Sequence, residues 1–482
     1  MSSFSKLIFH LWQNPRFILY LFLFSLILTF YISLTYYDPD FGWHLKTGQY
    51  ESQHFIPDHT LFNYTMPSYP YVDHEWLTNI TMYQIHQVGG NFPLALLVTF
   101  IIGLLLILIY QSTNQFQILA PLLVFASLIS QIGIRPQILA WLYTTFLIRI
   151  LISHKYLHFL PLLFILWANT HGSYIFGLVI VIAYLFYQWN TKSSSTITFI
   201  FLSITCILST FITPYFGRNF WEIYQTMRDT QLSTNIAEWQ PFYKNPNLIF
   251  IFISTLLISL IFYLNYSKTI RIATIVLIIF ASSAIRHAPL FTIITAPWIT
   301  HLLIQFSQKI KHLPNSKLRF QLSYYLLCTI ALTIIIIETP FAILHSNDMS
   351  KSNFYPQAAS QHLNKISHGQ IFSSYNWGGY LIGQNHYPLF IDGRMPSYNW
   401  QAPQGELNNA FTTYSIITQG NQVELYFHQF NIQTVLWPQP QQSRWQGKPS
   451  LDPFISQLEP LGFKLIYSDH ISLIYHKESS WQ

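Results

Sequence analysis

Charged side chains are scarce in this sequence, and so is cysteine. Only 9% of the 482 residues are charged, whereas 51% are hydrophobic. A soluble globular protein carries about 25% charged residues, so this composition excludes an ordinary soluble domain. The two cysteines, Cys206 and Cys328, lie inside apolar runs and form neither a CxxC pair nor a zinc-binding pattern. A disulfide framework is therefore not expected.

Further absences limit the chemistry. There is no GxGxxG motif, so nothing indicates a nucleotide-binding loop. The basic residues are scattered over short loops, and the net charge of +6 does not indicate a nucleic-acid partner. The first apolar run, 17–37, is not followed by a small-residue cleavage site. We therefore expect an uncleaved first membrane span rather than a signal peptide.

Long apolar runs dominate what is present. A helix needs about 20 mostly apolar residues to cross a bilayer. Eleven segments meet or approach that length, at 17–37, 93–110, 118–134, 137–153, 157–169, 173–189, 196–213, 248–266, 270–285, 287–306 and 321–339. The sequence thus predicts a polytopic α-helical membrane protein with about eleven spans. These spans belong to a transmembrane domain, 1–344, with long outer loops at 38–92 and 214–247.

The distribution of charge predicts an orientation. With the N-terminus in the cytoplasm, the cytoplasmic segments hold eleven basic residues and no acidic one, whereas the opposite loops hold six basic and nine acidic residues. Cytoplasmic loops carry an excess of Lys and Arg. The eleven are Lys6, Arg16, Arg149, Lys155, Lys192, Lys268, Arg271, Lys309, Lys311, Lys317 and Arg319. We expect a multi-pass protein of the plasma (inner) membrane, with a cytoplasmic N-terminus and an extracytoplasmic C-terminal domain.

That C-terminal domain, 345–482, lacks a spanning run and has the pattern of a soluble α/β domain. Strands are predicted at 370–373, 388–391, 434–437, 463–467 and 472–475, and helices at 355–366, 405–418, 421–430 and 452–461. Asn376-Trp377-Gly378-Gly379-Tyr380 and Asp392-Gly393-Arg394 are expected to be turns at strand ends. Such turns are either structural or face a ligand.

Acidic residues gather in the first outer loop. Asp38-Pro39-Asp40 comes where the first span ends, with His44 close behind, and Asp73-His74-Glu75 follows further along the loop. Carboxylates at the end of a span cost free energy unless they are solvated or used. They either form a polar cap that orders the loop or belong to a site. Their residue types suit a metal ion, but their spacing is specific to no metal.

Arginine and histidine occupy other outer turns. Arg135 lies between the third and fourth apolar segments, His171 between the fifth and sixth, and Arg286-His287 between the ninth and tenth. Singly, each is either a snorkelling cation or a helix-end residue. Together with the carboxylates, they suit a lipid-linked phosphate that is held by cations while a carboxylate takes a proton from an acceptor.

The second outer loop, 214–247, is long for a connection between spans. Its stretch Phe220-Trp221-Glu222-Ile223-Tyr224 has the pattern of an amphipathic helix that lies in the membrane interface. The loop ends with Glu238-Trp239 just before the next span, and Glu238 is a further candidate for substrate binding. The loop is either a lid over the site or a plain interfacial helix.

The order of these motifs resembles a known superfamily. Asp38-Pro39-Asp40-x-x-Trp43-His44 resembles the acidic first-loop motif of the GT-C superfamily, which comprises membrane glycosyltransferases that use polyprenyl-phosphate sugars. The whole set is similar to a group of bacterial membrane proteins that look like GT-C enzymes with a C-terminal periplasmic domain. That set adds Asp73-His74-Glu75-Trp76, Arg135-Pro136, Asn169-x-His171-Gly172, Asn376-Trp377-Gly378-Gly379-Tyr380 and Asp392-Gly393-Arg394. It extends in order over almost the whole chain.

The resemblance implies a role for the first-loop acids. Asp38 or Asp40 would act as the catalytic base or orient the acceptor, and in metal-dependent relatives the same position would hold a divalent cation. The second-loop acidic motif of the oligosaccharyltransferase is absent, because the hairpin after the third segment carries Arg135. Metal dependence therefore stays open.

We therefore expect transfer of a sugar from a polyprenyl-phosphate donor to a glycan, lipid or protein acceptor on the extracytoplasmic face. The candidate substrate-binding residues are His44, Asp73, His74, Glu75, Arg135, His171, Glu238, Arg286 and His287. Two alternatives belong to other classes. A non-enzymatic envelope assembly protein would need no acids at the first span, and a transporter or flippase would place ionisable residues at mid-membrane.

Overall fold

The chain divides into two compact units. The computed structural model describes residues 10–112, 118–190, 196–244, 246–366, 369–440, 452–478 and 481. Two basic residues of the predicted cytoplasmic set, Lys6 and Lys192, lie outside these ranges. Unit 1 comprises Met1–Leu34, Asn91–Thr213 and Leu232–His345, and unit 2 comprises Thr35–Gly90, Pro214–Gln231 and Ser346–Gln482. The two long outer loops and the C-terminal segment thus share unit 2, except for the second half of the second loop.

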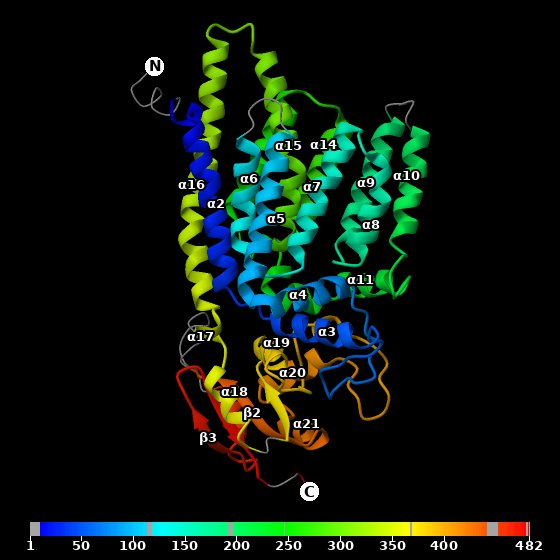
Figure 1. Cartoon of the computed structure of the whole chain (residues 1–482), viewed down its shortest axis with the longest axis vertical. Coiled ribbons are helices and arrows are strands. Elements are labelled where there is room, and N and C mark those ends of the chain that lie inside the picture. The colour runs from blue at the N-terminus through cyan, green and yellow to red at the C-terminus, as the bar shows by residue number, and fades with distance from the viewer. Residues whose placement is uncertain are drawn as a thin grey trace. The chain divides into compact units, whose positions relative to one another are not determined.

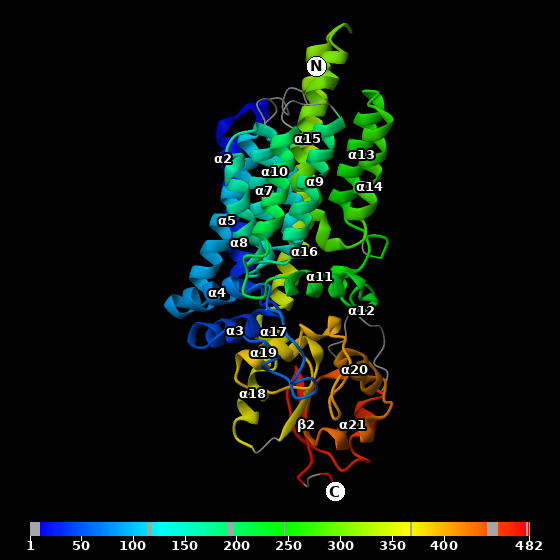
Figure 2. The same ribbon diagram turned by 90° about the vertical axis from the view of Figure 1, so that its right-hand side faces the viewer.

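Unit 1 is made of apolar helices that lie side by side (Figures 1 and 2). A helix occupies each of the eleven predicted apolar segments, and together these helices form nearly all of the unit. They are α2 (Pro15–Thr35), α5 (Asn91–Gln111), α6 (Leu119–Leu128), α7 (Gln137–Ser153), α8 (Leu160–Ala168), α9 (Tyr174–Asn190), α10 (Thr196–Ser209), α13 (Leu248–Tyr263), α14 (Lys268–Ala281), α15 (Ala288–Lys309) and α16 (Ser316–Asp348).

Four of these helices are long and apolar enough to cross a membrane. They are α2, α5, α15 together with the turn before it (Ile285–Lys309), and α16, and most of the others are shorter apolar helices. The short helix α6 is buried at all ten of its residues, which explains why its apolar side chains cover its whole circumference. A helical membrane protein is therefore confirmed, while the number of spans stays a prediction.

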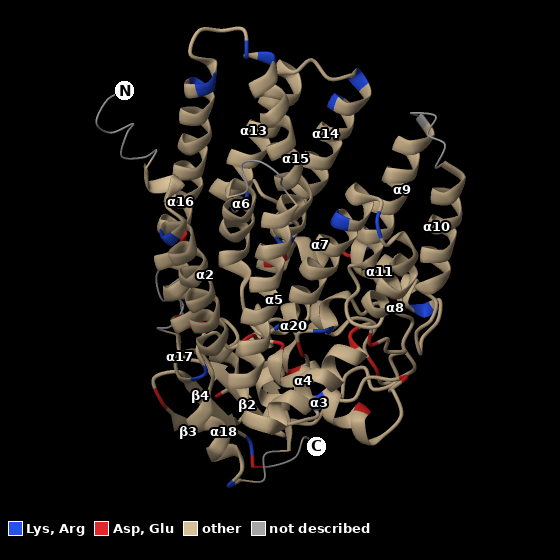
Figure 3. Ribbon diagram, turned by 45° about the horizontal axis from the view of Figure 1, so that its top comes forward, with Lys and Arg blue, Asp and Glu red and all other residues tan. Residues whose placement is uncertain are grey.

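Many Lys and Arg positions lie at one end of the unit 1 helices (Figure 3). This end contains the start of α14, the end of α15 and the start of α16, with Lys268, Lys309 and Lys317 among its basic residues. In contrast, all acidic residues except Glu238 and Glu338 belong to unit 2. The predicted orientation in the membrane rests on this asymmetry and stays a prediction.

Unit 2 combines helices from the outer loops with a small sheet. Its first helices are α3 (Phe41–Gln53) and α4 (Trp76–Gly89), which pack against each other, followed by α11 (Arg218–Arg228). The C-terminal segment adds α17 (Lys351–Phe354), α18 (Gln357–Leu363), α19 (Gly378–Gly383), α20 (Ala410–Thr418) and α21 (Val423–Gln429). The six-residue helix α12 (Thr230–Asn235) crosses the boundary between the units.

The sheet has four strands in the order β1-β2-β4-β3. Strand β1 (Gln370–Ser373) is parallel to β2 (Ile432–Pro438), whereas β4 (Ser472–His476) is antiparallel to both β2 and β3 (Lys464–Ser468). Buried aromatic rings pack around β1, where Phe372 contacts the rings of Phe390, Phe427 and Phe454. These strands lie within two residues of four predicted strands.

Three local predictions in the C-terminal segment are wrong. The predicted strand at 388–391 is reduced to single-residue bridges from Leu389, because Pro388 has no N–H to extend the pairing. The predicted helix at 452–461 is only a 3₁₀ turn, Ile455–Gln457, since the Asp452 side chain accepts the Phe454 N–H in a turn. The predicted turn at 376–380 is a 3₁₀ turn that continues into α19.

Candidate functional site

Asp38 and Asp40 lie between α2 and α3, at the start of unit 2. The backbone N–H of Asp40 donates to Oδ1 of Asp38 over 2.9 Å, and Oδ1 of Asp40 accepts from Nε1 of Trp43 over 2.9 Å. Asp38 is buried, with 6% of its surface exposed, whereas Asp40 is half-buried. The two carboxylates therefore differ in access: a bound molecule reaches Asp40 more readily than Asp38.

The C-terminal segment contacts the backbone around Asp40. Helix α19 crosses the start of α3 so closely that a Cβ on Gly379 would lie 2.1 Å from the carbonyl oxygen of Pro39. A Cβ on Gly42 would likewise lie 2.0 Å from the carbonyl oxygen of Gly379. Real side chains cannot be placed at such distances, so this crossing requires glycine on both helices. The motifs at 38–44 and 376–380 are thus neighbours in space.

The second glycine motif, Asp392-Gly393-Arg394, also lies in this part of unit 2. The guanidinium of Arg394 donates to Asp392 through two nitrogens, Nε over 2.9 Å and Nη2 over 2.7 Å. Burial lowers the pKa of Arg394, but the Asp392 carboxylate outweighs this effect and raises that pKa well above its usual value. The cation lies over the rings of Trp43, Phe62 and Tyr71, at 5.1 to 5.5 Å from their centroids.

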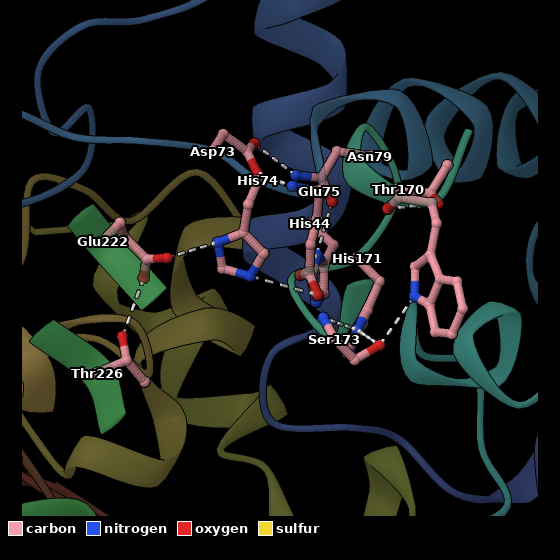
Figure 4. Close-up of polar contacts among 11 residues, drawn as sticks. His44, Asp73, His74, Glu75, Asn79, Thr170, His171, Ser173, Glu222 and Thr226 are labelled. Atoms are coloured by element: carbon pink, nitrogen blue, oxygen red, sulfur yellow. Dashed lines mark hydrogen bonds and ion pairs between the residues drawn. The ribbon is translucent and has the colours of Figure 1, made fainter. Parts of the chain in front are cut away.

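A chain of hydrogen bonds connects His44 to Asp73 (Figure 4). Nδ1 of His44 and Oδ1 of Asn79 are 2.6 Å apart, and Nδ2 of Asn79 donates to Oδ2 of Asp73 over 2.6 Å. Because the Asn79 oxygen can only accept, Nδ1 of His44 carries the proton. The backbone N–H of Glu75 donates to the other oxygen of Asp73 over 2.9 Å. All of these groups lie on α3, α4 or the loop between them.

Glu51, on the last turn of α3, forms a carboxyl pair with Asp73. Both residues are buried, and within the described residues no N–H donor reaches either oxygen of Glu51. Burial, with the neighbouring Asp73 carboxylate, raises the pKa of Glu51 to about 11. Glu51 is therefore protonated at neutral pH and can donate its proton to Asp73.

His74 pairs with α11. Its Nδ1 lies 3.2 Å from Oε2 of Glu222, and its Nε2 lies 3.8 Å from Oε1 of Glu75 (Figure 4). Glu222 also accepts from the hydroxyl of Thr226 over 3.1 Å. Burial lowers the pKa of His74, but the Glu222 carboxylate and then Glu75 and Asp73 outweigh it, so the pKa rises to about 10. His74 is therefore a cation at neutral pH.

Unit 1 holds a separate cluster of cations. Nη1 of Arg135 donates to Oε1 of Glu238 over 2.6 Å, and the guanidinium of Arg286 lies 4.4 Å from the centre of the Trp239 ring. Burial raises the pKa of Glu238, but Arg135, Arg286 and His345 together lower it below its usual value. Two predicted cations and one predicted carboxylate thus meet at the outer turns of unit 1.

The two other predicted histidines of unit 1 make contacts at helix ends. Nδ1 of His171 accepts the Ser173 N–H over 3.0 Å, and Nε1 of Trp167 donates to the Ser173 hydroxyl over 3.0 Å (Figure 4). The ring of His287 stacks on Phe280 with 5.3 Å between centroids. Both histidines thus make contacts that are typical of residues at the end of a helix.

The structure therefore divides the predicted site residues between the units. Unit 2 contains Asp38, Asp40, His44, Asp73, His74 and Glu75, and unit 1 contains Arg135, His171, Glu238, Arg286 and His287. The predicted site residues did not include three of their partners, namely Glu51, Asn79 and Glu222. Glu51 and Glu222 are acidic residues in the two long loops, and this position could have identified them as candidates. Nothing comparable in the sequence identifies Asn79.

No group of three or more His, Cys, Asp or Glu side chains in the described ranges is arranged to hold a metal ion. Within these ranges Asp38 and Asp40 thus have no third ligand of these types arranged beside them.

Solved structures share this fold. The structure of the archaeal oligosaccharyltransferase AglB from Archaeoglobus fulgidus, in complex with an inhibitory peptide and a dolichol-phosphate, matches with a TM-score of 0.55 and 13% identity. The match covers 87% of this chain and 69% of AglB. A second oligosaccharyltransferase structure from the same organism, tethered with an acceptor peptide that contains the NVT sequon, matches with a TM-score of 0.54 and 12% identity. It covers 89% of this chain and 70% of that protein.

A weaker likeness is to ArnT from Cupriavidus metallidurans bound to undecaprenyl phosphate, with a TM-score of 0.48, 10% identity, and coverage of 96% of this chain and 98% of ArnT. No protein-family profile and no curated protein matches the sequence. AglB and ArnT are GT-C membrane glycosyltransferases. At these identities a likeness concerns the fold alone, and the fold that the first-loop motif predicted, that of the GT-C superfamily, is confirmed by AglB.

Proposed function

We propose that this protein is a membrane glycosyltransferase that moves a sugar from a polyprenyl-phosphate donor to an acceptor on the extracytoplasmic face of the plasma membrane. The observation that carries the proposal is the half-buried Asp40, beside Asp38, in a chain with the fold of AglB. AglB was solved with a dolichol-phosphate bound. The likeness supports a lipid-phosphate donor for this chain as well.

The transfer step needs a base. An acceptor hydroxyl gives its proton to a carboxylate as its oxygen bonds to the anomeric carbon of the sugar, and the bond from that carbon to the phosphate oxygen breaks. The polyprenyl phosphate leaves with the bonding electron pair. Asp40 is the better-placed base because it is the more exposed of the two acids, and Asp38 fixes its backbone through the 2.9 Å hydrogen bond.

The phosphate of the donor needs cations. In our proposal Arg135 and Arg286 bind it, since charge-assisted contacts to phosphate are among the strongest hydrogen bonds in proteins. The ion pair of Arg135 with Glu238 holds that guanidinium in a fixed geometry before the donor arrives. Glu238 is then a positioning residue rather than a direct ligand of the phosphate.

A donor-consumption assay tests the proposal without knowledge of the acceptor. The full-length protein, in membranes of its own host, would receive radiolabelled undecaprenyl-phosphate glucose, mannose or aminoarabinose, and release of undecaprenyl phosphate would be measured. We expect at least one lipid-linked sugar to be consumed, and the matching nucleotide sugar to be inert. Correctly inserted protein that consumes none of these donors would contradict the proposal and favour an assembly protein.

A further inference from the structure

We propose that the turn Asp392-Gly393-Arg394 positions the carboxylate of Asp40, so that the C-terminal segment forms part of the catalytic geometry. This inference rests on the proposed function, because it assigns Gly393 as a positioning residue for the base of that reaction. It also gives the C-terminal segment a role that the sequence left open.

The contact begins at Gly393. A Cβ on Gly393 would fall 2.0 Å from Oδ1 of Asp40 and 3.2 Å from its Cγ. The backbone of the turn thus lies directly against the carboxylate, and any side chain at this position would push the carboxylate away. The φ angle of Gly393 is not in the left-handed region, so a side chain here would act by displacing the Asp40 carboxylate and not by straining the backbone.

The same oxygen is held from another direction. Nε1 of Trp43 donates to Oδ1 of Asp40 over 2.9 Å. Oδ1 is therefore confined between an indole N–H and the backbone of Gly393.

Trp43 is itself fixed by the turn. The guanidinium of Arg394 lies 5.5 Å from the centre of the Trp43 ring, and Arg394 is held by its two hydrogen bonds to Asp392. The exposed fractions of these two side chains are 4% for Arg394 and 0% for Asp392. A buried ion pair held by two hydrogen bonds is rigid, because neither side chain can adopt another geometry without breaking them. Contacts thus connect Asp392 through Arg394 and Trp43 to Asp40.

The backbone beneath Asp40 is fixed by the same segment. The close crossing of α19 over α3 at Gly379 and Gly42 places the carbonyl of Pro39 against α19. Both the side chain and the backbone of Asp40 therefore depend on residues from the C-terminal segment. Because misplacing a catalytic group by about 1 Å can cost about 10²-fold in rate, small changes in this turn should be costly.

Kinetics of lipid-linked sugar transfer test the positioning role. We expect Gly393→Ala to lower kcat by about 10²-fold while the KM for the undecaprenyl-phosphate sugar stays unchanged, since the added methyl displaces a base and not a donor ligand. Trp43→Phe, which removes the N–H together with part of the indole ring, should lower kcat in the same way. The matched control is Gly103→Ala in α5, whose Cβ would meet the flexible end of Leu26 at 3.0 Å and the ring of Phe22 at 3.9 Å.

A double-variant comparison separates positioning from general damage. If Gly393 acts through Asp40, adding Gly393→Ala to Asp40→Asn should cause no further loss of kcat. Additive losses, or an unchanged kcat in both Gly393→Ala and Trp43→Phe, would overturn the inference.

A cross-linking experiment tests the contact independently of activity. Cys206 and Cys328 are both buried, so the native thiols should not form disulfides with an engineered pair. Full-length Asp40→Cys/Gly393→Cys should form a disulfide under mild oxidation, because the two side chains would start within bonding reach. The single Asp40→Cys variant should not. Absence of the disulfide would overturn the inference, whereas a disulfide in a protein that transfers no sugar would overturn only the proposed function and the role built on it.

Discussion

The imidazole of His74 and the carboxylate of Glu222 form an ion pair with 3.2 Å between Nδ1 and Oε2. This pair connects the first outer loop to α11, which the sequence offered only as an interfacial helix or a lid. Because both residues belong to unit 2, the second loop is anchored to the first through a titratable contact. That contact makes the stability of unit 2 dependent on pH.

The pH dependence follows from the raised pKa of His74. Its pKa of about 10 in the folded protein exceeds the ordinary value of 6.5, so the folded state holds this proton more tightly than the unfolded state does. The stabilisation is complete below pH 6.5 and is lost as the pH rises towards 10. We expect Glu222→Gln to lower the Tm of the detergent-solubilised protein at pH 6, and to lower it much less at pH 10. A Tm difference that does not change with pH would contradict this account of the pair.

Glu51 should respond to pH through its pair with Asp73. Its pKa of about 11 is also raised above the ordinary value of 4.5, so the parent protein loses stability relative to a neutral side chain as the pH rises between these values. Glutamine has the shape of the protonated acid and supplies an N–H donor to Asp73. The Tm of Glu51→Gln should therefore exceed that of the parent by more at pH 9 than at pH 5. The difference in the free energy of unfolding between the two proteins should change by at most about 1.4 kcal/mol per pH unit.

The matched control for Glu51 is Asp58→Asn in the same loop, where the carboxylate is 74% exposed. Its Tm should follow that of the parent at every pH. If Glu51→Gln followed the parent as well, Glu51 would be ionised in the folded protein, and the shared proton would be excluded.

The cation cluster of unit 1 gives a prediction about lipid binding. Arg135→Gln should weaken the binding of undecaprenyl phosphate by about 1.5–3 kcal/mol, the range for hydrogen bonds to charged groups. Glu238→Gln should weaken it less than Arg135→Gln does, because it leaves the guanidinium in place and removes only the carboxylate that positions it. Arg149→Gln is the control, since Arg149 lies on the same helix α7 and donates to the carbonyl of Leu108. Equal affinities in Arg135→Gln and the parent would reduce Arg135 to a structural partner of Glu238.

Topology is the fourth prediction. The excess of basic residues at one end of the unit 1 helices predicts a cytoplasmic N-terminus and an extracytoplasmic C-terminus. A reporter that is active only in the cytoplasm should be inactive when fused after Gln482. The same reporter inserted between α15 and α16, at 312–315, should be active. The opposite pair of results would reverse the assignment.

Much of the fold was predictable because it depends on local composition. The eleven helices of unit 1 follow from apolar runs. The strands of the sheet follow from short β-branched and aromatic stretches. Each of these features needs information from fewer than about 20 neighbouring residues.

The site was less predictable because its contacts join distant segments. The sequence indicated Asp40 and the turn Asp392-Gly393-Arg394 as two separate features. Their contact depends on how α3, α19 and the turn pack in three dimensions. Likewise Asp73 was a candidate, while its partner Glu51 was not. Residue types indicate chemistry, whereas the pairing of residues is decided by tertiary packing that periodicity does not encode.

The central claim is that a first-loop carboxylate serves as the base for sugar transfer. The most direct measurement compares the rate of transfer from an undecaprenyl-phosphate sugar in the parent, in Asp40→Asn, in Asp38→Asn/Asp40→Asn, and in the exposed control Asp58→Asn. A positioned base contributes about 10²–10⁴-fold to a rate, so the account predicts a loss of that size in the first two variants and none in the control. Substitution by Asn preserves the shape of the side chain, so expression and membrane insertion should not change. A double variant that transfers sugar at the parent rate would contradict the claim.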